Sequence, residues 1–89
     1  MSERAESVLK AIAAKGLVEV DASVKGASAY RVGKDSFAYS GKVMKDAGWR
    51  LAAEWASDES RFNRGFCVFA AYCLSGEYLV IRTEIPPEE

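Results

Sequence analysis

Apolar residues recur at helical spacing in two stretches of the chain. The first stretch, residues 2–15, carries them on one face, at Ala5, Val8, Leu9, Ile12 and Ala13. The second stretch, residues 35–47, places Phe37, Ser40, Met44 and Ala47 on one face. Asp35 or Ser36 can cap the second stretch, and a glycine suited to a helix C-cap follows each stretch. This spacing predicts two amphipathic helices.

The remaining apolar residues alternate with period two, the pattern of β-strands. Strands are predicted at residues 17–21, 28–32, 49–56, 66–74 and 78–85, with turns at 22–27, 57–65 and 75–77. In the third strand, the alternation predicts one buried face with Trp49, Leu51, Ala53 and Trp55. In the last strand, it predicts Leu79, Ile81 and Thr83 inward and Tyr78, Val80 and Arg82 outward.

The order helix, strand, strand, helix and three strands is typical of an α+β fold. We expect a two-layer sandwich in which two helices lie on one face of a mostly antiparallel sheet of about five strands. Residues 66–74, "FCVFAAYCL", are apolar on both faces. Such a strand lies in the middle of a sheet or is covered by a partner.

Length and charge limit the function classes. A chain of 89 residues supports one hydrophobic core, which predicts a single domain spanning residues 1–89. Twelve basic and thirteen acidic residues give a net charge of -1, which argues against nucleic acid and anionic membranes as partners. The sequence has no run of about 18 apolar residues and no apolar signal segment, so we expect a cytoplasmic protein with no direct membrane insertion.

The residues that usually carry chemistry are scarce. The chain has no histidine, which removes the commonest general base and the commonest zinc ligand. Cys67 and Cys73 lie about 20 Å apart along an extended strand, too far to bridge, and are interpreted as reduced core thiols. "VGKDS" has one glycine where a phosphate-binding loop needs several, and is interpreted as a helix cap. No catalytic, cofactor-binding or metal-binding residue is predicted.

Aromatic residues offer two interpretations of a surface. Trp49 and Trp55 on one strand face could stack a ligand, although core packing fits them better because Leu51 shares that face. Tyr78 and Val80 on the outer face of the last strand could form a docking patch with neighbouring aromatic residues.

Residues 30–87 resemble a known family. "SAYRV", "KDAGWRLAAEWASDES", "RGFCVFAAYCL" and "YLVIRTEIP" are similar to the succession of strands and helix in the C subunit, or 30 kDa subunit, of NADH:quinone oxidoreductase, complex I. The same domain forms the N-terminal domain of the large subunit of energy-converting nickel–iron hydrogenase and formate hydrogenlyase. The family's acidic motif and the hydrogenase cysteine pairs lie beyond the segment that this chain matches. The resemblance therefore brings no metal, cluster or quinone ligand to any position here.

The resemblance implies a non-catalytic accessory or assembly domain, either a fragment or the N-terminal domain of a larger subunit. Its partner would be the catalytic large subunit, or the following domain, of a hydrogenase or dehydrogenase complex. The candidate interface residues are Phe66, Phe69, Tyr72, Tyr78 and Val80. A homodimer stays open.

Two other functions compete with this one. The first is a stand-alone α+β domain that senses a small molecule at its strand ends, which predicts a deep polar pocket. The second is a small enzyme with Asp58 or Glu54 as general base, which predicts a carboxylate in a cleft.

Overall fold

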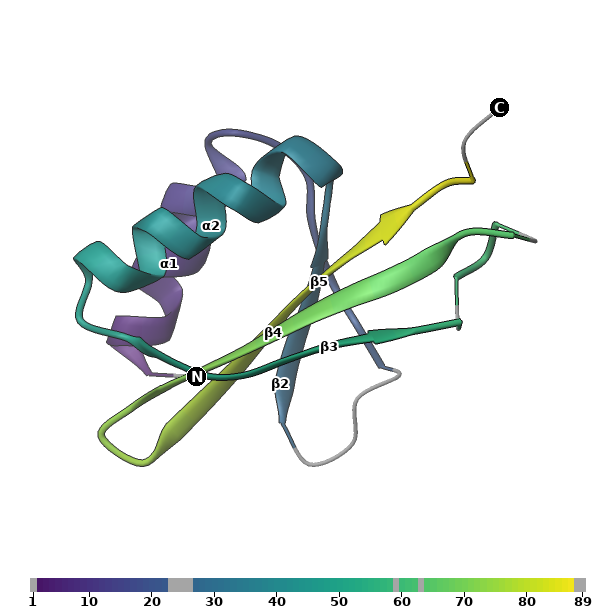
Figure 1. Ribbon diagram of the computed structural model, residues 1–89. Helices are drawn as coiled ribbons and strands as arrows, with labels where there is room; N and C mark the ends of the chain where they lie inside the picture. The colour runs from purple at the N-terminus through teal and green to yellow at the C-terminus, as the bar shows by residue number, and fades with distance from the viewer. Residues whose placement is uncertain (1, 23–26, 59, 63, 88–89) are drawn as a thin grey trace.

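The predicted α+β sandwich is confirmed by a computed structural model, which describes residues 2–22, 27–58, 60–62 and 64–87. The elements follow in the order α1 (Glu3–Ala13), β1 (Val18–Val20), β2 (Ser28–Val32), α2 (Lys34–Asp46), β3 (Arg50–Ser57), β4 (Phe66–Leu74) and β5 (Glu77–Ile85). Both helices lie on the same face of the sheet (Figure 1). Residues 23–26 of the first predicted turn, and residues 59 and 63 of the second, lie outside the described residues.

The five strands form one mixed sheet in the order β1-β2-β5-β4-β3. The pair β2 and β5 is parallel, and the other three neighbouring pairs are antiparallel. β5 is therefore the central strand, and β4 lies between β5 and β3. The apolar residues on both faces of β4 follow from burial of both faces: Ala70 and Tyr72 lie in the main core beneath the helices, and Cys67 and Phe69 lie in a second buried cluster.

The two helices begin differently. Ser2 caps α1, since its hydroxyl accepts a hydrogen bond from the Ala5 amide at 3.2 Å. The expected cap of α2 was Asp35 or Ser36, but the helix begins earlier, at Lys34, with Gly33 as its N-cap. The reason is that β2 ends at Val32 and the chain turns directly into the helix. Gly33 has no side chain, and no side-chain hydrogen bond caps α2.

The main core lies between the helices and the sheet. Its most deeply buried apolar side chains are Ile12, Met44, Leu79 and Ile81. The predicted inward positions of β5 therefore face the helices, as expected. In the described part of the chain, neither helix is long and apolar enough to cross a membrane.

A bulge in β3 overturns the predicted face of that strand. The register to β4 shifts between Leu51 and Ala53, so that Leu51 pairs with Tyr72 and Ala53 with Ala71. Consecutive residues of β4 point to opposite faces, and Leu51 therefore shares the helix-covered face while Ala53 and Trp55 share the other. Trp49 lies in the main core at 3% exposure, whereas Trp55 is 41% exposed. The two tryptophans form no common platform for a ligand.

Candidate functional site

The sheet face opposite the helices carries a row of one residue from each strand, which we call the cross-strand row. Strand register places Glu19 opposite Arg31, Arg31 opposite Arg82, Arg82 opposite Phe69, and Phe69 opposite Trp55. The rings of Trp55 and Phe69 stack, with centroids 4.9 Å apart and planes 2° from parallel. The guanidinium carbon of Arg82 lies 5.7 Å from the centroid of the Phe69 ring, within cation–π range.

The charged half of the cross-strand row extends into an alternating ion network. Arg82 Nη1 donates to both carboxylate oxygens of Asp21, at 3.3 and 3.2 Å, and Arg82 Nη2 donates to Glu84 at 2.7 Å. Arg31 pairs with Glu19, and its Nη1 lies 3.6 Å from Glu84 Oε2. Arg61 Nε lies 2.9 Å from the same oxygen. The side chains of Asp21, Arg82 and Glu84 are only 7%, 10% and 6% exposed.

Electrostatics in this network favour the charged arginines. The hydrogen bond with Glu19 raises the pKa of Arg31. Burial lowers the pKa of Arg82, but the hydrogen bond to Glu84 and the charge of Asp21 outweigh burial and raise the pKa overall. Phe69, Val80, Cys67 and Ala29 form a second buried cluster beside these charges. The cross-strand row and its ion network therefore bury the sheet face that no helix covers. Their role in the protein is structural.

The five predicted interface residues do not form one patch. Phe69, Tyr72 and Val80 are buried, at 2%, 8% and 3% exposure, while Phe66 and Tyr78 are exposed at 40% and 58%. Phe66 pairs with Ile85 at one end of the β4–β5 ladder, and Tyr78 pairs with Cys73 near the other end. Whether Phe66 or Tyr78 contacts a partner stays a prediction.

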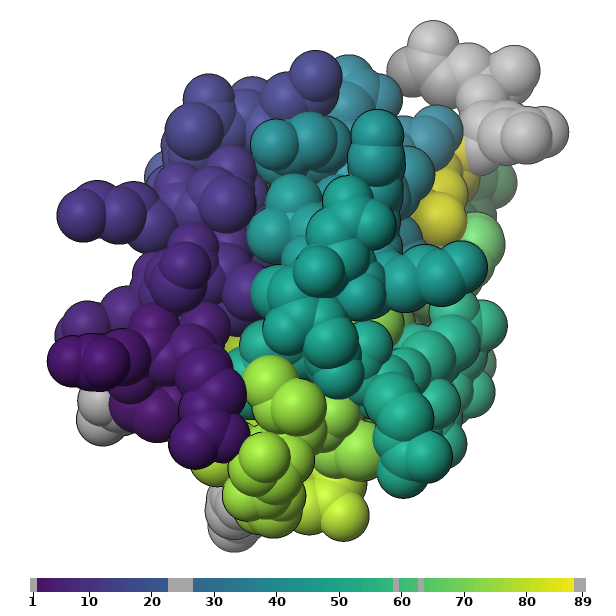
Figure 2. Space-filling model, turned by 90° about the vertical axis from the view of Figure 1, so that its left-hand side faces the viewer, coloured from purple at the N-terminus to yellow at the C-terminus, as the bar shows by residue number. Residues whose placement is uncertain are grey.

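β3 is the longer of the two edge strands, and it lacks cover. All its residues from Arg50 to Ala56 are exposed, including Leu51 at 50% and Trp55 at 41%. Packed helices lie about 10 Å apart and strands about 4.8 Å apart, so two helices cover roughly four of five strands. Figure 2 views the molecule from the side that the helices cover, where α1 (purple) and α2 (blue to teal) lie side by side. We call the two faces and the outer edge of β3 the β3 surface.

A groove of about 450 Å³ runs between α2 and β3, lined by Gly41, Lys45, Trp49, Arg50, Leu51 and Tyr72. A Cβ atom at Gly41 would lie 3.2 Å from the Tyr72 hydroxyl oxygen, so this mid-helix glycine leaves room for the phenol. Burial raises the pKa of Tyr72, and the negative charge of Glu54 raises it further. The groove thus adjoins the β3 surface on the helix side.

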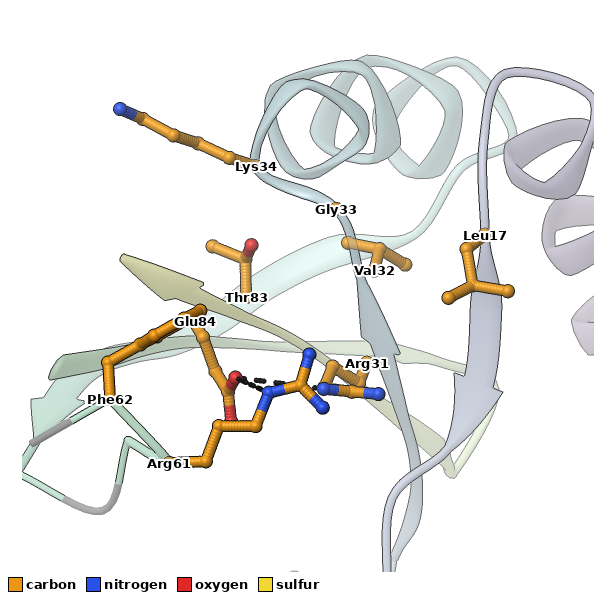
Figure 3. Close-up of a pocket in the computed structure, with 9 residues that line it drawn as sticks. All are labelled: Leu17, Arg31, Val32, Gly33, Lys34, Arg61, Phe62, Thr83 and Glu84. Atoms are coloured by element: carbon orange, nitrogen blue, oxygen red, sulfur yellow. Dashed lines mark ion pairs between the residues drawn. The ribbon is translucent and has the colours of Figure 1, made fainter. Parts of the chain in front are cut away.

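A second pocket lies where β2 ends and β5 continues, and we call it the strand-end pocket (Figure 3). Its volume is about 160 Å³, and it is lined by Leu17, Arg31, Val32, Gly33, Lys34, Arg61, Phe62, Thr83 and Glu84. Thr83 is 2% exposed, and its hydroxyl has no hydrogen-bond partner among the described residues. Sequence reasoning missed this pocket, although "VGKDS" supplies one wall of it.

The predictions about single reactive groups had mixed outcomes. Glu54 and Asp58 are both exposed rather than held in a cleft, which contradicts the general-base interpretation. Cys67 is buried, as expected, whereas Cys73 is partly exposed and so is not the core thiol that was expected. No group of three or more His, Cys, Asp or Glu residues that could hold a metal ion occurs among residues 2–22, 27–58, 60–62 and 64–87.

The chain matches no protein-family model, no curated protein and no solved structure. The resemblance to the oxidoreductase C subunit therefore stays a prediction.

Replacing Arg82 with methionine should lower the free energy of unfolding by about 3 kcal/mol, because Asp21 and Glu84 would stay buried without the guanidinium. Arg61→Met is the matched control, since the Arg61 side chain is 65% exposed and its ion pair should contribute less than about 1 kcal/mol. Urea unfolding of both variants measures the difference. Equal losses would show that the buried network does not stabilise the open face.

Tyr72→Phe should remove part of the loss of stability at alkaline pH. Because burial raises the pKa of Tyr72 above that of an unfolded tyrosine, the unfolded chain releases this proton first. Stability then falls as pH rises past about 10, where a free tyrosine ionises. Urea unfolding at a series of pH values should give a shallower decline for Tyr72→Phe than for the wild type. Tyr78→Phe, at an exposed position, should decline like the wild type, and the same slope in all three proteins would refute this role of Tyr72.

Proposed function

We propose that this chain is a non-catalytic docking domain of a multisubunit respiratory oxidoreductase, of the membrane-bound hydrogenase, formate hydrogenlyase or NADH:quinone oxidoreductase type. Its β3 surface would bind the catalytic large subunit, or a domain that follows in the same subunit. The observation that carries docking is that β3, at one edge of the sheet, is exposed on both faces from Arg50 to Ala56. The protein would act in the cytoplasm and reach the membrane through its complex.

The β3 surface has the properties of a protein interface. Its outer edge presents backbone N–H and C=O groups to which a partner strand can pair, as in β-strand addition. Leu51 and Trp55 offer apolar contacts on the two faces of the strand. The Trp55 ring is already held against Phe69, so binding would immobilise it at little entropic cost. Tryptophan is also among the residues that contribute most to binding at interfaces.

The type of partner rests on the sequence resemblance of residues 30–87. Catalysis would lie in that partner, because the chain has no histidine and its most deeply buried charged side chains are bound to one another in the ion network. The docking residues would be Leu51 and Trp55, with Phe66 and Tyr78 as outer contacts.

The strand-end pocket favours a second candidate function, a domain that senses a small molecule at its strand ends. Its volume of about 160 Å³ is smaller than the range of about 300–1,000 Å³ typical of drug-sized ligands. The pocket fits a small polar group rather than a cofactor. Docking therefore ranks first, and ligand binding is compatible with it.

Charges on the β3 surface should abolish docking. The double variant Leu51→Glu/Trp55→Glu should fail to form a complex with the catalytic large subunit of a hydrogenase or dehydrogenase from the same organism, because burying two unpaired carboxylates is costly. Co-expression with each candidate subunit, followed by size-exclusion chromatography, measures the complex. The wild-type chain should co-elute with one of them.

Val20→Glu is the matched control, since Val20 is 81% exposed but lies on β1, at the opposite edge of the sheet. This variant should keep the complex. Failure of the wild-type chain to bind any such subunit would contradict the proposed partner. Self-association of the purified chain that the double variant abolishes would instead make the β3 surface a homodimer interface.

A further inference from the structure

We propose that the strand-end pocket binds a phosphate group, either inorganic phosphate or the phosphate of a small ester. This site lies apart from the β3 surface and goes beyond docking. Three features converge on it: the uncapped start of α2, a buried hydroxyl with no partner in the described chain, and an excess of positive charge.

The start of α2 supplies hydrogen-bond donors. The first helical hydrogen bond runs from the Phe37 amide to the Gly33 carbonyl at 3.0 Å. The amides of residues 34–36 come before this bond and therefore have no acceptor within the helix. Gly33 offers these amides no side-chain acceptor, unlike Ser2 at the start of α1. Amides at a helix start, together with the helix dipole, favour an anion.

Thr83 provides the second and independent feature. Its side chain projects from β5 into the space beneath the start of α2, with the hydroxyl turned toward Gly33 and Lys34 (Figure 3). The hydroxyl is buried and has no hydrogen-bond partner among the described residues. A buried hydroxyl is destabilising unless it is paired, and a phosphate oxygen can accept its hydrogen bond.

The charges around the pocket leave a small positive excess, which favours an anion. Arg31, Lys34 and Arg61 line the pocket together with one carboxylate, Glu84, and Glu19 also pairs with Arg31. In Figure 3 the Lys34 amine extends away from the pocket, so Arg31 and Arg61 are the cations nearest to a bound ligand. Arg61 is 65% exposed and contacts Glu84 from outside, so its side chain can turn toward a ligand without movement of the backbone. Arg31 is held in place by Glu19 and Glu84. Guanidinium groups bind phosphate oxygens through paired hydrogen bonds.

The size and rim of the pocket limit the ligand. A volume of 160 Å³ equals about five waters at roughly 30 Å³ each, which accommodates a phosphate but not a nucleotide. Leu17 and Phe62 line the pocket as apolar residues and are 63% and 38% exposed. They can contact the carbon chain of a small ester, so the site fits a phosphate with at most a few carbons attached.

Titration of the ¹⁵N-labelled protein, followed by amide shifts in NMR spectra at constant ionic strength, tests this site. Inorganic phosphate, glycerol 3-phosphate and acetate are the probes. The amides of Lys34, Asp35 and Ser36 should shift saturably with phosphate, whereas those of α1 should not. Equal affinity for the two phosphates would mark the phosphate group as the ligand, and tighter binding of glycerol 3-phosphate would mark an ester. Acetate binding as tightly as phosphate would overturn the phosphate assignment.

Two pairs of variants separate a built site from general charge attraction. Thr83→Val keeps the shape and should weaken phosphate binding about tenfold without loss of fold, because one charge-assisted hydrogen bond disappears. Arg61→Ala should weaken binding several-fold, and Arg64→Ala, an equal change of charge at an exposed residue outside the pocket lining, should leave it unchanged. The absence of saturable shifts, wild-type affinity in Thr83→Val, or equal effects of the two arginine variants would overturn the proposal.

Discussion

Arg82 connects the aromatic half of the cross-strand row, Phe69 and Trp55, with its charged half. On one side its guanidinium packs against Phe69, and on the other it binds Asp21 and Glu84. The apolar residues on the sheet face away from the helices can be buried by the sheet's own side chains or by a partner. Arg82 allows the first solution, because its planar cation satisfies buried carboxylates and an aromatic ring at the same time. Both candidate sites depend on this arrangement.

The consequences extend outward along the sheet in both directions. Toward β3, the ring of Phe69 stacks on the ring of Trp55. Trp55 stays 41% exposed because β3 is an edge strand and no further strand lies beside it. Toward β2, Glu84 positions Arg31 and contacts Arg61, two of the cations that line the strand-end pocket. One network therefore sets the geometry of an apolar surface at the sheet edge and of a cationic pocket at the strand ends.

The periodicity of the sequence was sufficient to predict the elements, and local interactions explain why. Each helix and strand was located within a few residues, and Ser75 and Gly76 close the predicted tight hairpin with φ values of 50° and 82°. The bulge in β3 could not be predicted, because residues 49–56 alternate without interruption and the shift depends on pairing with β4. The face assigned to Trp55 was wrong for this reason, whereas Trp49 is buried as predicted.

The candidate sites depend on contacts between distant segments, which periodicity does not specify. The cross-strand row takes one residue from each strand, and the strand-end pocket combines residues near positions 17, 31–34, 61–62 and 83–84. The burial of Val80 and Arg82, which were predicted to point outward, could not be predicted either. Alternation along a strand indicates the face on which a side chain lies, but not which side chains cover that face.

Hydrogen exchange of the isolated protein tests most directly whether β3 lacks cover. Amides of β5, the central strand, should exchange only through global unfolding. Amides of β3 that point away from β4 should exchange orders of magnitude faster, because water reaches them in the folded state. Equal protection of β3 and β5 would contradict the account, since it would mean that the free edge is already covered in the absence of any partner.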